Sequence, residues 1–292
     1  MAANRVIGVD VGGTKIRAGL VEPDGTIAHL VERQTDTTSQ AALLDQLGEI
    51  VRSLPLDGVQ AVGFGLPTRV DAARGIAVGT AVNIPVRDVP FREEMQRRIG
   101  LPVEVENDAS CAGLAEYTFG AGRGTRDMLI LTLGTGVGGG VVTAGRLYRA
   151  WTELGHMVIV ADGSPCMGAC SGRGHVESYC SGQAVDFLAR EVLDRPDATA
   201  HDLVAARHPA LEQVGHLLGV AIGSLVNIFG STRVVIGGGF GVAAFDQLVP
   251  AARRAVLREA LSPSGTDLEL APAELSEPGV IGAGLVALEA VQ

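Results

Sequence analysis

Two glycine-rich segments, more than a hundred residues apart, constrain the fold of this chain more than any other feature. The first reads DVGGTK at residues 10–15, and the second reads GTGVGGG at residues 134–140. Each lies between two runs typical of β-strands, so each is predicted to be the turn of a hairpin. A Walker loop or a Rossmann fingerprint leads from a strand into a helix instead. The pair therefore predicts a nucleotide held between two lobes, each contributing one phosphate loop.

Composition and charge exclude two classes of function. A formal net charge of −10 argues against nucleic-acid binding, which rests on a positive field. The chain starts with MAANR and passes directly into the run VIGV, without the long apolar segment of a signal peptide. Its longest apolar stretches are interrupted by Gly, Ser, Asn or His before they reach a membrane-spanning length. We therefore expect a cytoplasmic protein that binds neither nucleic acid nor membranes.

Strands and helices are expected to alternate along the chain. In the first half the residue patterns predict strands at 6–10, 15–22, 26–34, 59–65 and 103–106, and helices at 39–54, 91–99 and 109–117. The second half repeats the plan, with strands at 128–133, 138–142 and 234–236 and helices at 214–229 and 281–291. A phosphate loop between two strands is typical of an actin-like or hexokinase-like ATPase lobe, so we predict an α/β fold of that kind.

Five motifs, taken in order, resemble the ROK family, which includes bacterial sugar kinases and sugar-responsive repressors. They are DVGGTK at 10–15, ENDA at 106–109, GTGVGGG at 134–140, ELGH at 153–156 and IGGG at 236–239. The resemblance covers essentially the whole chain and is strongest to the glucokinases of the family. The family's repressors carry an added N-terminal helix-turn-helix domain, for which there is no room before the first strand. The resemblance therefore favours an enzyme over a regulator.

The resemblance implies a two-lobed fold built from duplicated ribonuclease-H-like domains, with a cleft between the lobes. The small lobe is expected at residues 1–107 together with a returning C-terminal helix at 280–292, and the large lobe at 108–279. The implied activity is ATP-dependent phosphorylation of glucose at its 6-hydroxyl, by a homodimer. Other hexoses (fructose, mannose, N-acetylmannosamine or N-acetylglucosamine) are alternatives within the enzymes, and a non-catalytic sugar sensor is the alternative outside them.

The glycine-rich segments carry the expected nucleotide contacts. Small residues let backbone N–H groups approach phosphate oxygens, threonine hydroxyls add donors, and Asp10 is placed to hold Mg²⁺ directly or through water. A plain tight turn is the alternative for the first segment, and a flexible hairpin for the second. The glycines after the strand at 234–236 are expected to lie against adenosine, with a simple strand-to-helix turn as the alternative. The expected ATP and Mg²⁺ contacts are Asp10, Gly12, Gly13, Thr14, Lys15, Gly134, Thr135, Gly136, Gly138, Gly237, Gly238 and Gly239.

Asp108 is the expected catalytic residue. Phosphoryl transfer to an alcohol needs one carboxylate that accepts the hydroxyl proton as the new P–O bond forms. Asp108 lies where a strand ends and a helix begins, so its carboxylate can face a cleft. The alternative is that Asp108 is only the N-cap of that helix, a common role for Asp. The resemblance implies the general base.

Two histidines and two cysteines form a candidate zinc site: His156, Cys166, Cys170 and His175. These residue types in a glycine-rich loop are typical of a closed structural zinc site, and in a cytosolic protein they favour a metal over a disulfide. The family's usual run is Cys-x-Cys-Gly-x-x-Gly-Cys-x-Glu. Here the first two cysteines are two residues further apart, and His175 stands where the third would fall. The alternative is an unligated loop with reduced cysteines. Cys111 and Cys180 are expected to be packing residues.

The sugar contacts are implied by the resemblance alone: Gly65, Asn83, Asn107, Asp108, Glu153, His156 and Glu177. In this interpretation His156 binds zinc through one ring nitrogen and a sugar hydroxyl through the other. A solvated surface charge is the alternative for each glutamate. Two neighbouring residues differ from the family's pattern, in which Thr68 is usually glycine and Trp151 is usually small. Trp151 is expected to pack in the core rather than line the pocket.

Overall fold

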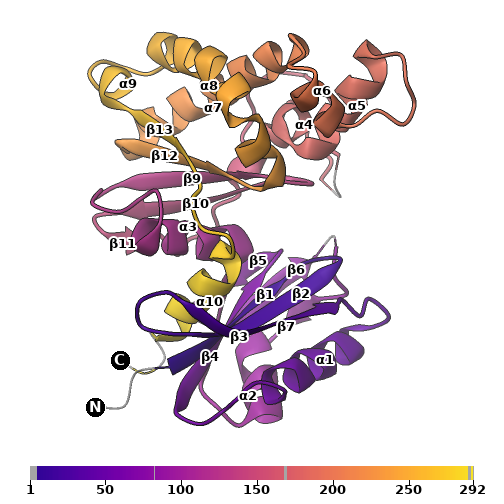
Figure 1. The fold of residues 1–292 in the computed structure, drawn as a ribbon, viewed down its shortest axis with the longest axis vertical. Coiled ribbons are helices and arrows are strands. Elements are labelled where there is room, and N and C mark those ends of the chain that lie inside the picture. The colour runs from indigo at the N-terminus through magenta and orange to yellow at the C-terminus, as the bar shows by residue number, and fades with distance from the viewer. Residues whose placement is uncertain (1–4, 82, 168–169, 289–290, 292) are drawn as a thin grey trace. The chain divides into compact units, whose positions relative to one another are not determined.

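The computed structural model describes residues 5–81, 83–167, 170–288 and 291 (Figure 1). The chain forms two compact units. Unit 1 comprises Met1–Gly120, Arg149–Trp151 and Leu275–Gln292, and unit 2 comprises Ala121–Tyr148 and Thr152–Glu274. The expected small lobe also includes residues 1–4, 82, 289–290 and 292, which lie outside the described residues.

Unit 1 is built on a five-stranded sheet with the order β3-β2-β1-β4-β8. Its strands are β1 (Arg5–Val11), β2 (Lys15–Val21), β3 (Ile27–Gln34), β4 (Val59–Leu66) and β8 (Val103–Asn107). The first three pair antiparallel, and β4 and β8 run parallel to β1. All five match the strands predicted from sequence. A second sheet of β5 (Arg69–Asp71), β6 (Ile76–Thr80) and β7 (Arg87–Val89) was not predicted, because its strands are too short to show a pattern.

Four helices belong to unit 1: α1 (Gln40–Arg52), α2 (Phe91–Ile99), α3 (Asp108–Phe119) and α10 (Pro278–Leu288). α1 begins where the sequence predicts, because the Ser39 hydroxyl accepts a hydrogen bond from the amide of Ala42 at 3.1 Å. The final helix was predicted at 281–291 and is observed one turn earlier, and residues 289–290 of that prediction lie outside the described residues.

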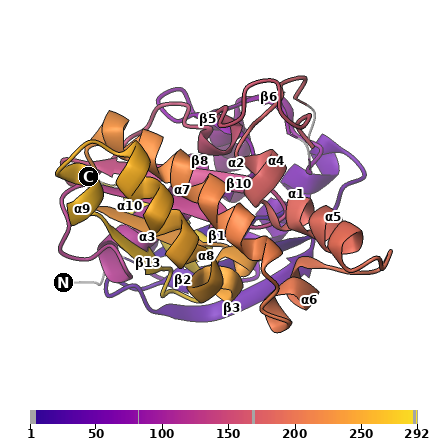
Figure 2. The ribbon, with the colours of Figure 1, turned by 90° about the horizontal axis from the view of Figure 1, so that it is seen from above.

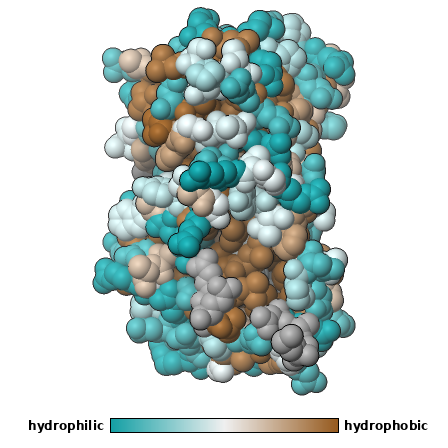
Figure 3. Space-filling model, turned by 90° about the vertical axis from the view of Figure 1, so that its left-hand side faces the viewer, coloured by the Kyte–Doolittle hydropathy of each residue, from teal (hydrophilic) through white to brown (hydrophobic). Residues whose placement is uncertain are grey.

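Helix α10 lies directly on the sheet of unit 1, so that the end of the chain meets its first strands (Figure 1). A Cβ atom at Gly8 of β1 would stand 1.9 Å from the carbonyl oxygen of Val280. One at Gly63 of β4 would stand 1.8 Å from that of Ala283. Only glycine fits where the helix backbone touches the strands. The side of unit 1 drawn in Figure 3 shows an apolar, hollowed area.

Unit 2 repeats the sheet of unit 1 in strand order and direction. Its order is β11-β10-β9-β12-β13, formed by β9 (Met128–Leu133), β10 (Val137–Thr143), β11 (Arg146–Leu147), β12 (Arg233–Gly237) and β13 (Glu269–Pro272). β9, β10 and β11 pair antiparallel, and β12 and β13 run parallel to β9. In each unit the glycine-rich segment is therefore the turn that joins the central strand to its antiparallel neighbour.

The helical elements of unit 2 are η1 (Leu154–His156), α4 (Glu177–Cys180), α5 (Gly182–Val192), α6 (Ala200–Ala205), α7 (Ala210–Phe229), α8 (Gly239–Glu259) and α9 (Ser264–Asp267). α7 confirms the predicted long helix. The equally long α8 was not predicted, because Pro250 lies inside it and proline normally ends a helical pattern.

α7 and α8 pack side by side (Figure 2) through a row of small residues. A Cβ atom at Gly215 would stand 2.4 Å from the carbonyl oxygen of Leu248, and one at Gly219 would stand 2.3 Å from that of Ala252. The two backbones are therefore in contact.

α7 is the one described helix that is long and apolar enough to cross a membrane, by length and composition alone. From sequence, every apolar stretch was expected to be interrupted before it reached a membrane-spanning length. By length and mean hydropathy, α7 does not meet that expectation. Of its most apolar 18-residue window, 56% is buried inside the protein, as in the core helix of a folded domain.

We expect Gly219→Ala to lower the free energy of unfolding by about 1–3 kcal/mol, because the new methyl group overlaps the Ala252 carbonyl. At an open helix position the same change would stabilise the protein by roughly 0.5–1 kcal/mol, so the sign is diagnostic. Urea denaturation measures this change in the free energy of unfolding. Ser224→Ala is the control, because that hydroxyl bonds only back to Val220 within the same helix. A stabilising Gly219→Ala would contradict the packing described.

Candidate functional site

The carboxyl ends of three parallel strands bring the predicted residues of unit 1 together. The strand register aligns Asp10 of β1 with Gly65 of β4, and Gly65 with Glu106 of β8. Asn107 and Asp108 follow at the end of β8. A Cβ atom at Gly65 would stand 3.5 Å from the Cα atom of Asp108, so glycine leaves room beside that residue. The carboxyl edge of a sheet is the usual place for ligands in α/β folds.

Asn107, not Asp108, is the N-cap of α3, which corrects one of the two interpretations of Asp108. The Asn107 side chain accepts a hydrogen bond from the amide of Ser110 at 3.1 Å and donates one to the carbonyl oxygen of Thr68 at 3.3 Å. Asp108 is the first residue of the helix, and its Oδ1 accepts from the amide of Ala109 at 2.8 Å. Asp108 thus lies at the N-terminus of α3, where the helix dipole places a partial positive charge.

The segment 149–151 adds two contacts that the sequence analysis missed. The Arg149 guanidinium lies 3.3 Å from the carboxylate of Glu106, whose side chain is only 6% exposed. Trp151 was expected in the core, but it is 56% exposed and lies over the guanidinium of Arg69. Neither pairing leaves a signal in the sequence, because the partners are about forty and eighty residues apart.

The first glycine-rich turn closes tightly in unit 1. The amide of Gly12 donates to the carbonyl oxygen of Lys15 at 2.9 Å. A Cβ atom at Gly13 would stand 2.6 Å from that of Asn83, so the turn and a predicted sugar contact lie side by side. The Lys15 ammonium group lies 3.2 Å from the carboxylate of Glu32.

Asp10 lies in an unusual electrostatic environment. Burial is the main reason that its pKa rises to about 6, and the nearby Glu277 carboxylate adds to the increase, against the opposing charges of Arg17 and Lys15. The Asp10 carboxyl group packs against the start of α10, since a Cβ atom at Gly279 would stand 2.5 Å from its Cγ. The Glu277 carboxylate is itself paired with the Arg17 guanidinium at 2.9 Å.

The second glycine-rich turn is anchored from two sides in unit 2. The amide of Gly182 donates to the carbonyl oxygen of Gly134 at 2.7 Å. On the other side, the amide of Val137 donates to Oε2 of Glu177 at 3.0 Å. Glu177 is thus not a free surface charge, which was the alternative to its predicted role.

A cavity of about 610 Å³ opens beside this turn. It is lined by Gly134, Thr135, Gly182, Gln183, Asp186, Phe187, Arg190, Gly239 and Phe240. Helices α5 and α8 both begin at its wall, and the positive ends of their dipoles favour an anionic group there. Gly238 has a φ of 77° and turns the chain from β12 into α8, so the predicted strand-to-helix turn is present as well.

Three of the predicted nucleotide residues, Gly134, Thr135 and Gly239, line this cavity. The wall formed by α5 was missed. Its Phe187 side chain is 53% exposed and lies under the guanidinium of Arg190. An exposed aromatic residue on a helix that starts with glycine is the one signal that could have drawn attention to it.

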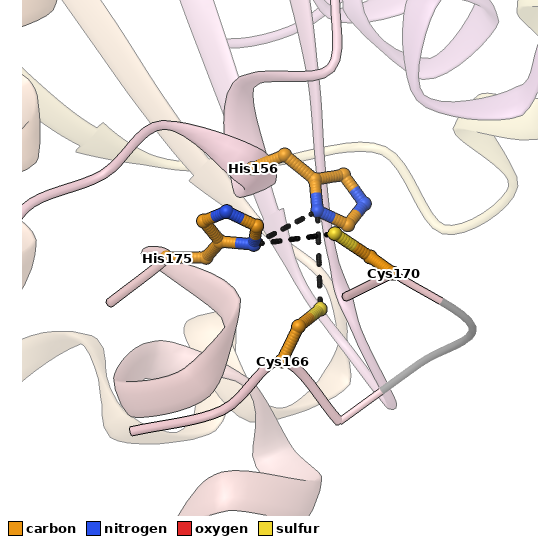
Figure 4. A group of neighbouring side chains, drawn as sticks. All are labelled: His156, Cys166, Cys170 and His175. Atoms are coloured by element: carbon orange, nitrogen blue, oxygen red, sulfur yellow. Dashed lines mark hydrogen bonds between the residues drawn. The ribbon is translucent and has the colours of Figure 1, made fainter. Parts of the chain in front are cut away.

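The predicted metal ligands converge (Figure 4). The ligand atoms of His156, Cys166, Cys170 and His175 all lie within 4.8 Å of one another. The two Nδ1 atoms are 3.2 Å apart, and each faces one cysteine sulfur at 3.9 Å. The Nε2 atom of His156 lies on the far side of its ring, so this residue has a second nitrogen outside the cluster.

These donors fit zinc. Around a tetrahedral ion with ordinary bond lengths, two nitrogens stand about 3.3 Å apart and a nitrogen and a sulfur about 3.5 Å. The observed nitrogen–nitrogen separation of 3.2 Å is close to the first value, and the two nitrogen–sulfur separations of 3.9 Å exceed the second by about 0.4 Å. The backbone also orients one ligand, because the amide of Gly172 donates to the Cys170 sulfur at 3.2 Å.

A sequence profile of the ROK family matches residues 6–290. The glucokinase of Thermotoga maritima is 34% identical over 98% of this chain and 98% of its own length. The ROK hexokinase of Thermus thermophilus has a TM-score of 0.83 at 32% identity, over 98% of this chain and 99% of that one. A ROK family glucokinase from Streptomyces griseus, solved with glucose and AMPPNP, has a TM-score of 0.85 at 29% identity, over 98% and 100%. The relatives also include xylose repressors at 25–27% identity.

Protein purified without added metal is expected to contain about one zinc per chain by elemental analysis. Cys166→Ala should lose it, because three ligands bind a structural zinc weakly. Cys180→Ala is the matched control, since burial raises the pKa of the Cys180 thiol to about 12 and it lies outside the cluster. Two results would contradict a zinc site at this cluster: wild-type protein that contains no zinc, or Cys166→Ala protein that still contains about one zinc per chain.

Proposed function

The chain belongs to the ROK family, and from this premise we propose that it transfers the γ-phosphoryl group of ATP to the 6-hydroxyl of glucose. Among the features of this chain, the position of Asp108 at the start of α3 is the strongest support. A carboxylate at the carboxyl edge of a sheet, with Gly65 beside it, is suited to accept a proton from a sugar hydroxyl.

Asp108 would accept the proton of the 6-hydroxyl as the P–O bond to the γ-phosphorus forms and the bond to the leaving ADP breaks. Asn107 would contact a neighbouring sugar hydroxyl, because its side-chain amide has more donor and acceptor sites than its two hydrogen bonds to the protein use. By resemblance, the ring hydroxyls would be bound by Gly65, Asn83, Glu153, His156 and Glu177. The Arg149–Glu106 ion pair supports this interpretation, because it fixes the strand end from which Asn107 and Asp108 project.

ATP would lie with its adenosine in the cavity beside α5 and α8 and its phosphates at the two glycine-rich turns. Mg²⁺, when bound, would neutralise charge that develops on the phosphates. Asp10 is the residue proposed to hold it, and its position directly before the first glycine-rich turn supports that proposal.

Zinc would be held by His156, Cys166, Cys170 and His175, where it would cross-link the loop that follows η1. With Nδ1 of His156 facing the other ligands, its Nε2 would remain for a sugar hydroxyl. A cytoplasmic homodimer, with residues 108–279 as the large lobe, is proposed from the resemblance.

ADP release with Mg·ATP tests the function directly. The rate of ADP release is to be compared for glucose, mannose, fructose, N-acetylglucosamine and N-acetylmannosamine. We expect the highest kcat/KM with glucose. A different leading sugar would direct attention to Thr68 and Trp151, where the chain departs from the family's pattern. No turnover with any sugar, in folded and zinc-loaded protein, would contradict the proposal and favour a sugar sensor.

We expect Asp108→Asn to lower kcat by about 10²–10⁴-fold, because the amide cannot accept the hydroxyl proton. Glucose affinity, measured by calorimetry, should change little, since the amide still forms hydrogen bonds. Asp57→Asn, which changes an exposed carboxylate of the same unit, is the control. Unchanged turnover in Asp108→Asn would remove Asp108 from the reaction.

A further inference from the structure

Glu177 connects the metal-ligand cluster to the glycine-rich turn of unit 2. Its Oε2 atom accepts the hydrogen bond from the amide of Val137 at 3.0 Å. Its Oε1 atom lies 3.8 Å from the sulfur of Cys166. One side chain thus touches the turn with one oxygen and a metal ligand with the other.

The contact with the turn is tight. A Cβ atom at Gly136 would stand 2.4 Å from Oε2 of Glu177, so the carboxylate lies directly against the backbone of the turn. Only glycine at this position leaves room for the Glu177 side chain, so a displacement of Glu177 changes the environment of the turn.

Val137 is held by residues next to both histidine ligands. Its amide is bound by Glu177, which follows His175 by two residues. Its carbonyl oxygen faces Gly155, where a Cβ atom would stand 2.0 Å away, and Gly155 immediately precedes His156. An ion that fixes the two histidines therefore fixes both contacts with the Val137 residue.

From these contacts we infer that zinc at the cluster and nucleotide phosphates at the 134–137 turn bind cooperatively, with Glu177 as the positioning residue that couples them. The inference rests on the proposed function, because it requires the turn to bind phosphate. With zinc bound, Glu177 holds the Val137 amide and the turn is preorganised. Without zinc, the nucleotide itself has to order the turn, and its affinity falls.

The test is the dissociation constant of Mg·AMPPNP, measured by calorimetry without sugar, for zinc-loaded protein and for protein stripped with a chelator. We expect about tenfold weaker binding to the stripped protein. The reciprocal measurement is the zinc affinity in competition with a chelating dye. It should increase by the same factor when Mg·AMPPNP is present, because coupling between two binding sites is reciprocal.

Substitutions at Glu177 separate coupling from a purely structural role. The coupling factor is the AMPPNP dissociation constant of stripped protein divided by that of zinc-loaded protein. Glu177→Ala removes both contacts and should bring this factor close to one. Zinc should remain bound, because Glu177 is outside the ligand set. Glu177→Gln keeps an oxygen that can accept from Val137, so it should retain part of the coupling. Glu191→Gln, an exposed residue of α5, is the control and should keep the full factor.

Equal AMPPNP affinity in zinc-loaded and stripped folded protein would overturn the inference. So would a coupling factor that survives in Glu177→Ala. If zinc-loaded wild-type protein does not bind AMPPNP at all, the proposed kinase function fails and the coupling fails with it. If AMPPNP binds equally in both metal states, only the coupling fails.

Discussion

Backbone lying directly on backbone is the constraint on which the rest of this structure depends. α10 touches β1 and β4 where Gly8 and Gly63 leave no side chain between them, and any larger residue would push the helix off the sheet. The same close approach sets Gly279 of α10 against the Asp10 carboxyl group. The packing that brings the end of the chain back to its first strand therefore also creates the buried, negatively charged surroundings of Asp10.

The two units show how a repeated plan acquires different chemistry. Both place a glycine-rich turn after the central strand of a sheet with the same strand order. In unit 1 the turn packs against Asn83, and a carboxylate precedes it in the strand. In unit 2 the corresponding turn packs against Glu177 and Gly182, next to a cavity and to the metal-ligand cluster. What differs lies in the loops, while the sheets stay alike.

Local patterns predicted most of the strands and the long helix α7, because apolar periodicity and a cap such as Ser39 act over a few residues. They missed α8, whose internal Pro250 breaks the helical pattern although packing against α7 overrides it. The candidate metal ligands could be singled out because their residue types are rare and close in sequence, and the structure brings them together. The Arg149–Glu106 pair and the exposed Trp151 were not, because such contacts depend on tertiary structure and leave no periodic signal.

The histidine at position 175 has an electrostatic consequence for Glu177. A zinc ion with two thiolates and two neutral histidines carries no net charge, whereas three thiolates would leave a net charge of about −1. Oε1 of Glu177 lies 3.8 Å from the Cys166 sulfur, a distance at which a like charge repels strongly when partly buried. A neutral cluster would reduce that repulsion. Replacing a thiolate by His175 therefore favours the position from which Glu177 accepts the Val137 amide.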